Sequence, residues 1–521
     1  DWFQKGRVGK RPGSSIVLGS RLIVLSFLLS LCLDALARET VLDRVIDVQQ
    51  GVLEVPEVAR LEDGLDLDTK RVDVGDATLY VEEEGTGVPL VLINGGPGGT
   101  HHYFHPWFSR ASDYARVIYY DQRGTGLSDF EPGDSGYSVE QAVDDLDHMR
   151  QALGIDDWVV LGYSYGGFLA QYYATTYPEH VAGLVLVGSK PGLWAELGES
   201  RQYDYLSEVE KDRIRSVQKQ IVEMGKENEW PRETLIQKIL FNNFMNGDWK
   251  RQHFYKPTPA EIAVVARYEW VNERGFNGDL SRSADRVNLA GAFERSPFQT
   301  LILEGKWDLT WGEAKPALLA DNHPRARVIT IDDAGHNIFS ENPDHFFRDL
   351  EQFVRNLAPV SAQSLAVYQE DLTAWRRAWR ESPRYVILDA GPGKRGSEQI
   401  VAAYSNEWVE QISWPDELQR VGFALYDSRR FDDALVVFSN LEQLAVEESS
   451  ETDAALALIW KGHILDMLNR RNEAIVLYQQ VAEMNLSDST KHDEYEMSYV
   501  FSDYAKERIQ TPFTYIENDL P

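Results

Sequence analysis

The chain has 521 residues, of which 43% are hydrophobic and 11% aromatic, and it carries a formal net charge of −31 with a pI near 4.8. This length predicts two or three domains, and the apolar content suffices for sizeable cores, which excludes a largely disordered chain. A surface this acidic argues against nucleic acid or an anionic membrane as a general partner, because both carry negative charge themselves.

The first 37 residues have the pattern of an export signal. Basic residues between positions 5 and 11 precede an apolar run from Leu22 to Leu33, and Ala35-Leu36-Ala37 then fits the small-x-small rule for cleavage. We therefore predict a signal peptide over 1–37 and an exported protein, periplasmic or secreted, or anchored to a membrane if this segment stays uncleaved. The single cysteine, Cys32, lies here, so the mature chain is expected to have no disulfide and no thiol nucleophile.

Short apolar runs and helical segments alternate in the part of the chain that follows. The runs lie at 88–94, 116–120, 158–162 and 181–188, and they have the length and composition of strands buried on both faces. Between them, Ser138 has the position of a capping residue at the start of a helix that continues to Leu153. This alternation predicts an α/β fold with a mostly parallel sheet and helices on both faces.

The alternation stops and later resumes. Residues 191–296 are predicted to be mostly helical, and two further strand-like runs at 298–304 and 327–331 precede a helix from Pro343 to Leu357. We predict a sheet domain in two parts, 38–190 and 297–357, with a helical cap inserted between them at 191–296.

The C-terminal part, 358–521, is predicted to be all-α. Two similar stretches in it contain Ala434 and Ala474, which lie 40 residues apart, each followed by an apolar and aromatic helical pattern. Such a repeat is typical of tetratricopeptide-like helical hairpins and of a region that docks a protein partner, but an ordinary helical domain fits equally well. Residues from 381 to 398, rich in Gly, Pro and charge, are predicted to include a linker. Nothing in the pattern indicates an oligomeric state.

The sequence Gly162-Tyr163-Ser164-Tyr165-Gly166 is a G-x-S-x-G motif that follows an apolar run directly and opens a helical pattern. A sharp strand-to-helix turn needs these glycines, because side chains would clash there, and the turn presents the serine oxygen at a helix N-terminus. In this context the motif predicts a nucleophilic Ser164 in an α/β-hydrolase fold.

A serine hydroxyl is a poor nucleophile without a base, and the base needs an acid that orients it. In this fold the acid and then the histidine follow the serine along the chain. Asp308 and His336 each come just after one of the last two strand-like runs, where sites assemble in open α/β sheets. Asp332 and Asp333 are rival acids, but they adjoin the histidine too closely in sequence, so we favour Asp308.

An oxyanion hole needs two backbone N–H groups that face the developing negative charge. We expect one from Tyr165, the residue after the nucleophile, and one from the loop Asn94-Gly95-Gly96-Pro97-Gly98-Gly99, whose glycines allow close approach of backbone to substrate. A phosphate-binding role for this loop is disfavoured because no Gly-Lys-Ser/Thr follows it.

Three histidines, His101, His102 and His105, come shortly after this loop. They suggest a metal cluster, but no acidic residue or cysteine stands at ligand spacing from them. We therefore expect histidines that line or flank the cleft, and we predict neither a metal nor an organic cofactor.

Three ordered motifs resemble the prolyl aminopeptidase (proline iminopeptidase) family of serine peptidases with the α/β-hydrolase fold. They are Gly95 to Gly99 (GGPGG), Asp121 to Ser128 (DQRGTGLS) and Gly162 to Gly167 (GYSYGG). The resemblance covers roughly residues 66–357 and implies that Gly96 supplies the second oxyanion N–H. It departs from the family at Asn94, where a histidine is usual.

The family binds the free α-amino group of its substrate through acidic side chains of the cap. By resemblance, Arg267-Tyr268-Glu269 is similar to the family's anchoring stretch, so Glu269 is the candidate amino-group ligand, and Glu273 shares its helix face. Asp248 is a further candidate. Solvated cap charges are the alternative interpretation of these acids.

The resemblance implies an aminopeptidase that releases N-terminal residues, proline or other small or apolar ones, from short peptides. One alternative is an esterase or amidase that acts on small molecules with the same triad. Another is a partner-binding protein in which the hydrolase core is vestigial. Comparing free and N-acetylated substrates separates the first two hypotheses, since only an aminopeptidase requires the free amine.

Overall fold

The computed structural model describes residues 52–56, 67–129, 136–192, 205–268, 280, 283–284, 286–310, 315–391, 393–492, 495 and 497–517. The predicted signal peptide, 1–37, lies outside these ranges. Among the described residues, no helix combines the length and the apolar character that a membrane span requires.

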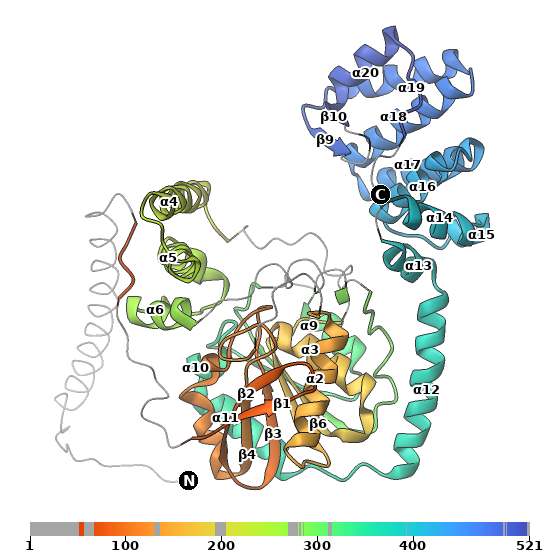
Figure 1. The fold of residues 1–521 in the computed structure, drawn as a ribbon. Helices are drawn as coiled ribbons and strands as arrows, with labels where there is room; N and C mark the ends of the chain where they lie inside the picture. Colours follow the sequence, from red (N-terminus) through yellow and green to blue (C-terminus); the bar gives the residue numbers. More distant parts are fainter. Residues whose placement is uncertain are drawn as a thin grey trace, which may run out of the picture. The chain divides into compact units, whose positions relative to one another are not determined.

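The centre of the chain is an eight-stranded sheet with the strand order β1-β2-β4-β3-β5-β6-β7-β8 (Figure 1). Strands β3 to β8 pair in parallel, and all six strands that the apolar runs predict are confirmed to within one residue at each end. The strands are β1 (Asp68–Asp73), β2 (Thr78–Gly85), β3 (Val88–Ile93), β4 (Ala115–Tyr120), β5 (Trp158–Tyr163), β6 (Val181–Val187), β7 (Gln299–Gly305) and β8 (Arg327–Ile331).

The first two strands were not predicted. They form an antiparallel hairpin at the edge of the sheet, and β2 pairs antiparallel with β4. Strand β1 has the sequence DTKRVD, in which only Val72 is buried, so it has no apolar run that would identify it.

Helices cover both faces of the sheet, as the alternation predicts. They are α2 (Val139–Ala152), α3 (Tyr165–Thr176), α9 (Lys315–Asn322), α10 (Ile338–Glu341) and α11 (Pro343–Arg355), with 3-10 turns η2 (His101–Phe104), η3 (Trp107–Asp113) and η4 (Pro178–His180). Ser138 caps α2 as expected, because its side chain accepts from the backbone N–H of Gln141 at 3.1 Å.

Alternate strand side chains point to opposite faces and build two separate cores. Val91 and Ile302 belong to the core with α2, α3 and α9, whereas Leu92 and Leu303 belong to the core with η2, η3, α10 and α11. Helix α12 (Ala362–Glu381) adds buried side chains to the first of these cores.

Part of the predicted cap forms a compact unit of its own, made of residues 205–250 and 256–267 with the short segment 52–56. Its elements are α4 (Glu208–Glu227), α5 (Arg232–Met245), η6 (Asp248–Arg251) and α6 (Pro259–Tyr268). Residues 52–56 are predicted to belong to the sheet domain. In the structure, however, the amide of Asn242 on α5 bonds to both the N–H (2.8 Å) and the C=O (3.2 Å) of Leu53.

The C-terminal region is built from helices that pack on their neighbours along the chain. They are α13 (Pro383–Ala390), α14 (Gly393–Ala403), α15 (Asn406–Val409), α16 (Pro415–Asp427), α17 (Phe431–Glu448), α18 (Glu451–Met467), α19 (Arg471–Met484) and α20 (Phe501–Gln510). The region is not entirely α-helical, because β9 (Ser489–His492) and β10 (Met497–Val500) form a short antiparallel hairpin.

The 40-residue repeat appears as two equivalent helix contacts. A Cβ atom built on Gly422 of α16 would lie 2.6 Å from the ring of Phe438 on α17, and one built on Gly462 of α18 would lie 2.6 Å from the ring of Tyr478 on α19. The two glycines are 40 residues apart in the sequence, and so are the two aromatic residues. The tetratricopeptide-like interpretation stays a prediction.

The linker predicted within 381–398 is wrong, because α13 and the first six residues of α14 occupy most of this segment. Ser382 accepts from the backbone N–H of Tyr385 at 3.2 Å, and Pro383 stands in the first helical turn, where its missing N–H costs nothing. Ile387 is fully buried. The same Pro and Ser that suggest a loop therefore begin a helix here.

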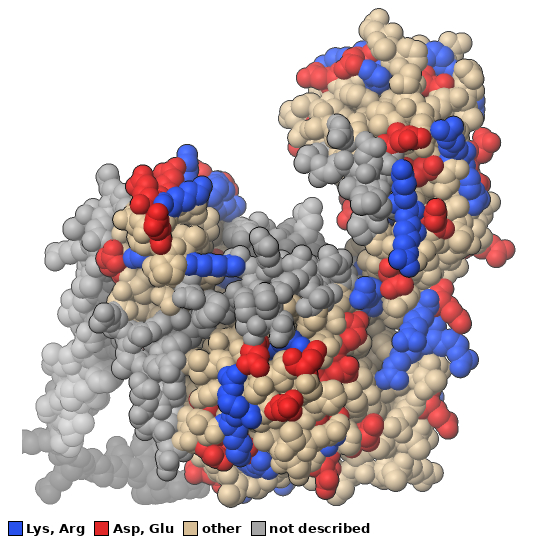
Figure 2. Space-filling model, in the orientation of Figure 1, with Lys and Arg blue, Asp and Glu red and all other residues tan. Residues whose placement is uncertain are grey.

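Acidic and basic side chains are interspersed on the described surface of the face shown in Figure 2. The net negative charge of the chain is therefore accompanied by many local pairs, such as Lys306 with Asp332 at 2.8 Å. Exposed pairs of this kind contribute little to stability.

Candidate active site

Ser164 stands on the turn between β5 and α3, at φ 56° and ψ −121°. A non-glycine residue with positive φ is strained, and such strain is often found at functional sites. The backbone around it is fixed, because its N–H donates to the carbonyl of Val187 (2.9 Å) and its own carbonyl accepts from Gly167 (3.0 Å) and Lys190 (3.0 Å). The structure therefore shows the sharp strand-to-helix turn that the G-x-S-x-G motif predicts.

The motif glycines allow this turn because there is no room for a side chain. A Cβ atom at Gly162 would lie 2.2 Å from the carbonyl oxygen of Gly166, and one at Gly166 would lie 2.2 Å from the carbonyl oxygen of Ile93. The second contact brings the start of α3 against the end of β3, where the glycine-rich loop begins.

The predicted acid and base are in contact. Nδ1 of His336 lies 2.8 Å from Oδ2 of Asp308, and both side chains are almost fully buried. The backbone N–H of Thr310 donates to the other carboxylate oxygen at 2.9 Å. The rivals Asp332 and Asp333 are exposed, and Asp332 pairs with Lys306 instead. An Nδ1–H that donates to Asp308 leaves Nε2 of His336 as the basic nitrogen.

Two further buried residues lie behind this pair, and no sequence motif predicts them. Nζ of Lys315, at the start of α9, lies 2.6 Å from Oδ2 of Asp308 and 2.5 Å from Oε2 of Glu304 at the end of β7. Both side chains are at most 2% exposed. Two carboxyl groups, one ammonium and one imidazole thus share a buried site. No known motif predicts that a lysine seven residues after the triad acid belongs to it.

The charges of this group shift each other's pKa. Burial opposes ionisation of Asp308, but the nearby His336 and Lys315 outweigh it and hold the pKa of this carboxyl well below its usual range. Burial would lower the pKa of Lys315, but Asp308 and Glu304 raise it instead. Burial raises the pKa of Glu304 to about 7. Asp308 is therefore the ionised partner of Lys315, and Glu304 is the carboxyl that holds a proton in mildly acidic solution.

His336 remains a base at neutral pH. Its burial lowers the pKa of the imidazole, and Lys315 adds to this effect against the opposing carboxylate of Asp308. Its ring packs against that of Tyr163, the residue before Ser164, with centroids 5.0 Å apart. Gly188 is at φ 49°, and a Cβ there would lie 3.0 Å from Nδ1 of His336. The ring is therefore confined beside the nucleophile turn.

A short segment from within the predicted cap belongs to the sheet domain. Residues 251–255 group with the domain that contains the triad, and the carbonyl of Gln252 accepts from the backbone N–H of His336 at 2.6 Å. The carbonyl of Arg251 accepts from Leu309, next to the triad acid, at 3.4 Å. This segment therefore supports both the acid and the histidine loops.

The glycine-rich loop lies against the nucleophile. A Cβ at Gly95 would lie 2.9 Å from Cβ of Ser164, and Gly96 has φ 120°. Asn94 is fully buried, and the side-chain amide of Gln122, from the DQRG motif, donates to its carbonyl oxygen at 3.1 Å and to its Oδ1. Two of the ordered motifs thus meet beside Ser164. The oxyanion roles of Gly96 and Tyr165 stay predictions.

The cap acids are only partly described. Glu269 and Glu273 lie outside the described residues. Asp248 lies in the cap unit, where its Oδ1 accepts from the hydroxyl of Tyr205 at 2.6 Å. The role of these acids as ligands of a substrate amino group remains a prediction.

The three histidines after the loop are buried, with exposed fractions of 1% for His101, 7% for His102 and 2% for His105. They do not line an open cleft. Acidic partners come from other strands of the sheet, namely Glu82 on β2 and Asp121 after β4. Local spacing in the sequence shows neither partner.

The comparisons with known proteins bear on the family of the chain. A family described as the alpha/beta hydrolase fold matches residues 88–343. A proline iminopeptidase of Neisseria meningitidis serogroup B is 38% identical over 293 residues, which are 50% of this chain and 87% of that protein. One of Saccharolobus solfataricus is 24% identical over 282 residues, or 52% of this chain and 86% of that protein.

Among solved structures, a proline iminopeptidase-related protein of Thermus thermophilus is 21% identical, with a TM-score of 0.43 over 57% of this chain and 100% of its own. The chain adds to these relatives a large helical C-terminal region. With its parallel sheet, its strained serine turn and this similarity over most of a relative's length, the chain belongs to the proline iminopeptidase family of α/β hydrolases.

Proposed function

We propose that the chain is a serine aminopeptidase that releases an N-terminal residue, proline or another small or apolar one, from short peptides. The observation that carries this proposal is the strained Ser164 turn beside the buried Asp308–His336 pair, in a chain of the proline iminopeptidase family. The individual roles below follow from that arrangement and from the chemistry of acyl transfer.

In the first step, Oγ of Ser164 attacks the carbonyl carbon of the N-terminal residue, and Nε2 of His336 takes the hydroxyl proton. Asp308 holds the imidazole in the required tautomer and stabilises its protonated form. The N–H groups of Gly96 and Tyr165 stabilise the negative oxygen of the tetrahedral intermediate. His336 then gives its proton to the leaving amine, and the N-terminal residue stays on Ser164 as an ester.

In the second step, a water molecule loses a proton to His336 and attacks this ester. Collapse of the second tetrahedral intermediate releases the free amino acid and returns the proton to Ser164. Specificity for the N-terminus requires a partner for the substrate ammonium, and we assign this role to the cap acids Glu269, Glu273 and Asp248, since a buried ammonium needs a carboxylate nearby.

The test is hydrolysis of a proline amide chromogenic substrate by the full chain, with and without an N-acetyl group. We expect cleavage of the free-amine form alone, because acetylation removes the charge that the cap acids bind. Cleavage of both forms, or of simple esters alone, would replace the aminopeptidase with a general amidase or esterase.

Ser164→Ala tests the nucleophile separately. We expect this variant to lose turnover and to resist labelling by a fluorophosphonate probe, while Ser439→Ala, at an exposed position on α17, keeps both. Full turnover by Ser164→Ala would disprove the assignment of the nucleophile, whatever substrate is used.

A further inference from the structure

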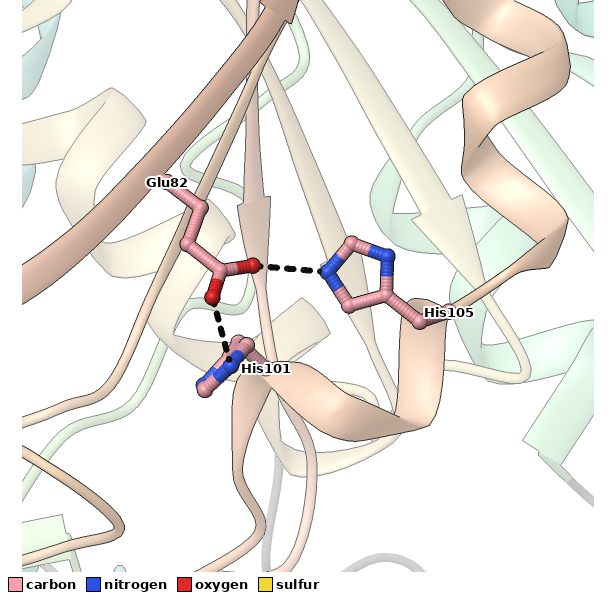
Figure 3. A group of neighbouring side chains, drawn as sticks. All are labelled: Glu82, His101 and His105. Atoms are coloured by element: carbon pink, nitrogen blue, oxygen red, sulfur yellow. Dashed lines mark hydrogen bonds and ion pairs between the residues drawn. The ribbon is translucent and has the colours of Figure 1, made fainter. Parts of the chain in front are cut away.

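A group of buried side chains outside the triad has the composition of a metal site. Glu82 on β2 lies between His101 and His105, and one oxygen of its carboxylate faces each imidazole (Figure 3). Oε1 lies 3.3 Å from Nε2 of His101, and Oε2 lies 2.9 Å from Nε2 of His105. One donor atom from each residue lies within 4.8 Å of the other two, and all three residues are buried.

The tautomer of His101 is fixed from its other side. Its Nδ1 lies 2.8 Å from Oδ1 of Asp121, a carboxylate that also accepts from the backbone N–H of His101 at 2.8 Å. With its proton on Nδ1, the neutral imidazole presents a lone pair on Nε2. A carboxylate that orients a histidine in this way is the usual outer partner of a metal ligand.

Nε2 of His101 lies 3.3 Å from Oε1 of Glu82 and makes no well-directed hydrogen bond within the described part of the chain, although it is buried. The imidazole of His101 therefore lies between two carboxylates, those of Asp121 and Glu82. Positive charge is required at this position, either as a second proton on the ring or as a metal ion bound to Nε2 in its place. Two ligands of a tetrahedral Zn²⁺ at about 2.0 Å each lie about 3.3 Å apart, so this spacing suits a metal.

Several carboxylates surround the two imidazoles, which favours a bound cation. Glu82 and Asp121 are buried carboxylates, and Glu84 lies close by, where it accepts from the hydroxyl of Tyr119. The ring of Tyr119 stacks on His105 with centroids 4.2 Å apart, and the hydroxyl of Tyr80 donates to Oε1 of Glu82 at 2.6 Å. A divalent cation with two neutral imidazoles would balance the charges of Glu82 and Asp121 in this site.

We propose that Glu82, His101 and His105 bind one divalent transition-metal ion of the zinc type, with Asp121 as the outer partner of His101. Imidazole and carboxylate donors suit Zn²⁺ and its spectroscopic substitute Co²⁺. Because the ligands are buried, the ion joins the chain during folding and links β2 to the turn η2 that follows the glycine-rich loop. Its role is structural, and it is independent of the proposed peptidase activity.

The first experiment titrates the metal-stripped full chain with Co²⁺ and follows the visible d–d absorption. We expect saturation at one ion per chain, with the intensity of a low-coordinate site, and loss of the signal when Zn²⁺ is added. Glu82→Gln and His105→Gln are expected to lose this band. The control His180→Gln, at a half-buried histidine whose ring contacts the carbonyl of Asp156, keeps it. No band in the folded wild-type protein, or equal bands in Glu82→Gln and His180→Gln, would overturn the proposal.

A second measurement needs no variant. X-ray absorption at the zinc edge of the reconstituted wild-type protein is expected to show scattering from two imidazole rings. Coordination by oxygen alone would place the ion elsewhere on this acidic chain and would overturn the assignment. Wild-type protein is also expected to gain thermal stability with Zn²⁺, and folded Glu82→Gln to gain none.

Discussion

Nζ of Lys315 lies 2.6 Å from Oδ2 of Asp308, the same oxygen that contacts Nδ1 of His336 at 2.8 Å. The acid of the triad is thus shared between the imidazole it orients and a buried ammonium. A positive charge this close disfavours protonation of His336, and it also offsets the negative charge of Asp308. Lys315 is therefore a positioning residue that acts on the base through the acid.

Lys315→Met is expected to change the pH dependence of the reaction. Catalysis needs neutral His336, so kcat/KM rises with pH through the pKa of this imidazole. Burial and Lys315 lower that pKa, so the wild-type chain stays active in mildly acidic solution. Removal of the ammonium favours the imidazolium, and the acidic limb of the profile moves to higher pH. A profile of kcat/KM against pH for both proteins measures this shift, and an unchanged acidic limb would show that Lys315 has no electrostatic effect on the base.

A double variant distinguishes charge from packing. Lys315→Met alone leaves Glu304 and Asp308 together without a cation, and breaking a buried pair in this way costs about 3–5 kcal/mol of unfolding free energy. Lys315→Met with Glu304→Gln leaves the single charge of Asp308 beside His336. We expect the double variant to be more stable than Lys315→Met by urea denaturation. Equal stability of the two would mean that lost packing, and not the unpaired carboxylates, causes the damage.

Glu304→Gln is expected to flatten part of the pH dependence of stability. Burial raises the pKa of Glu304 from 4.5 to about 7. Between pH 4.5 and about 7, Glu304 therefore keeps its proton in the folded chain and loses it in the unfolded chain. The stabilisation is complete below the unfolded pKa and is lost as pH rises through about 7. The amide of glutamine cannot titrate. Urea unfolding at several pH values across this window should therefore show a steeper fall for wild type than for the variant, and parallel curves would contradict the raised pKa.

Asp308→Asn tests which aspartate orients the base. An asparagine carries no charge to stabilise the imidazolium, and its amide can hold the imidazole in the wrong tautomer. Loss of the triad acid in this way lowers kcat by roughly 10⁴-fold. Asp332→Asn is the matched control, since Asp332 is four residues before His336 but its carboxylate is exposed and pairs with Lys306. Its kcat should stay within about two-fold of wild type. A large loss in Asp332→Asn with a small one in Asp308→Asn would reverse the assignment.

The strands and the triad could be predicted because each has a local signal. A strand buried on both faces needs a continuous apolar run, and the acid and histidine follow such runs directly, as Asp308 and His336 do. The hairpin strand β1 has polar side chains on an exposed edge, so its pattern does not differ from that of a loop. The linker prediction is wrong near Ser382 and Pro383 because serine at an N-cap and proline in a first turn also begin helices.

The supporting charges could not be predicted, because they depend on contacts between distant parts of the chain. Glu304 and Lys315 look like ordinary surface charges in the sequence, yet the end of β7 and the start of α9 bring them together in the interior. Glu82 is 19 residues before His101 and reaches it only because β2 passes beside the turn η2. Ligand spacing in a sequence detects metal sites within one segment and misses those that a sheet assembles.

The two equivalent helix contacts of the C-terminal region predict matched effects of substitution. Gly422→Ala and Gly462→Ala each place a methyl group about 2.6 Å from an aromatic ring that is buried in the same helical core, so the ring must move. Overpacking of this kind typically costs about 1–3 kcal/mol of unfolding free energy, whereas glycine to alanine in an unhindered helix stabilises. Thermal or urea denaturation should show that both variants are destabilised, with similar magnitudes because Phe438 and Tyr478 are related by the 40-residue repeat.

Ser439→Ala, an exposed position on α17, is the control and is expected to leave the transition unchanged. Destabilisation by only one of the two glycine variants would show that the two hairpins are not equivalent in packing, and stabilisation by both would contradict the contacts themselves.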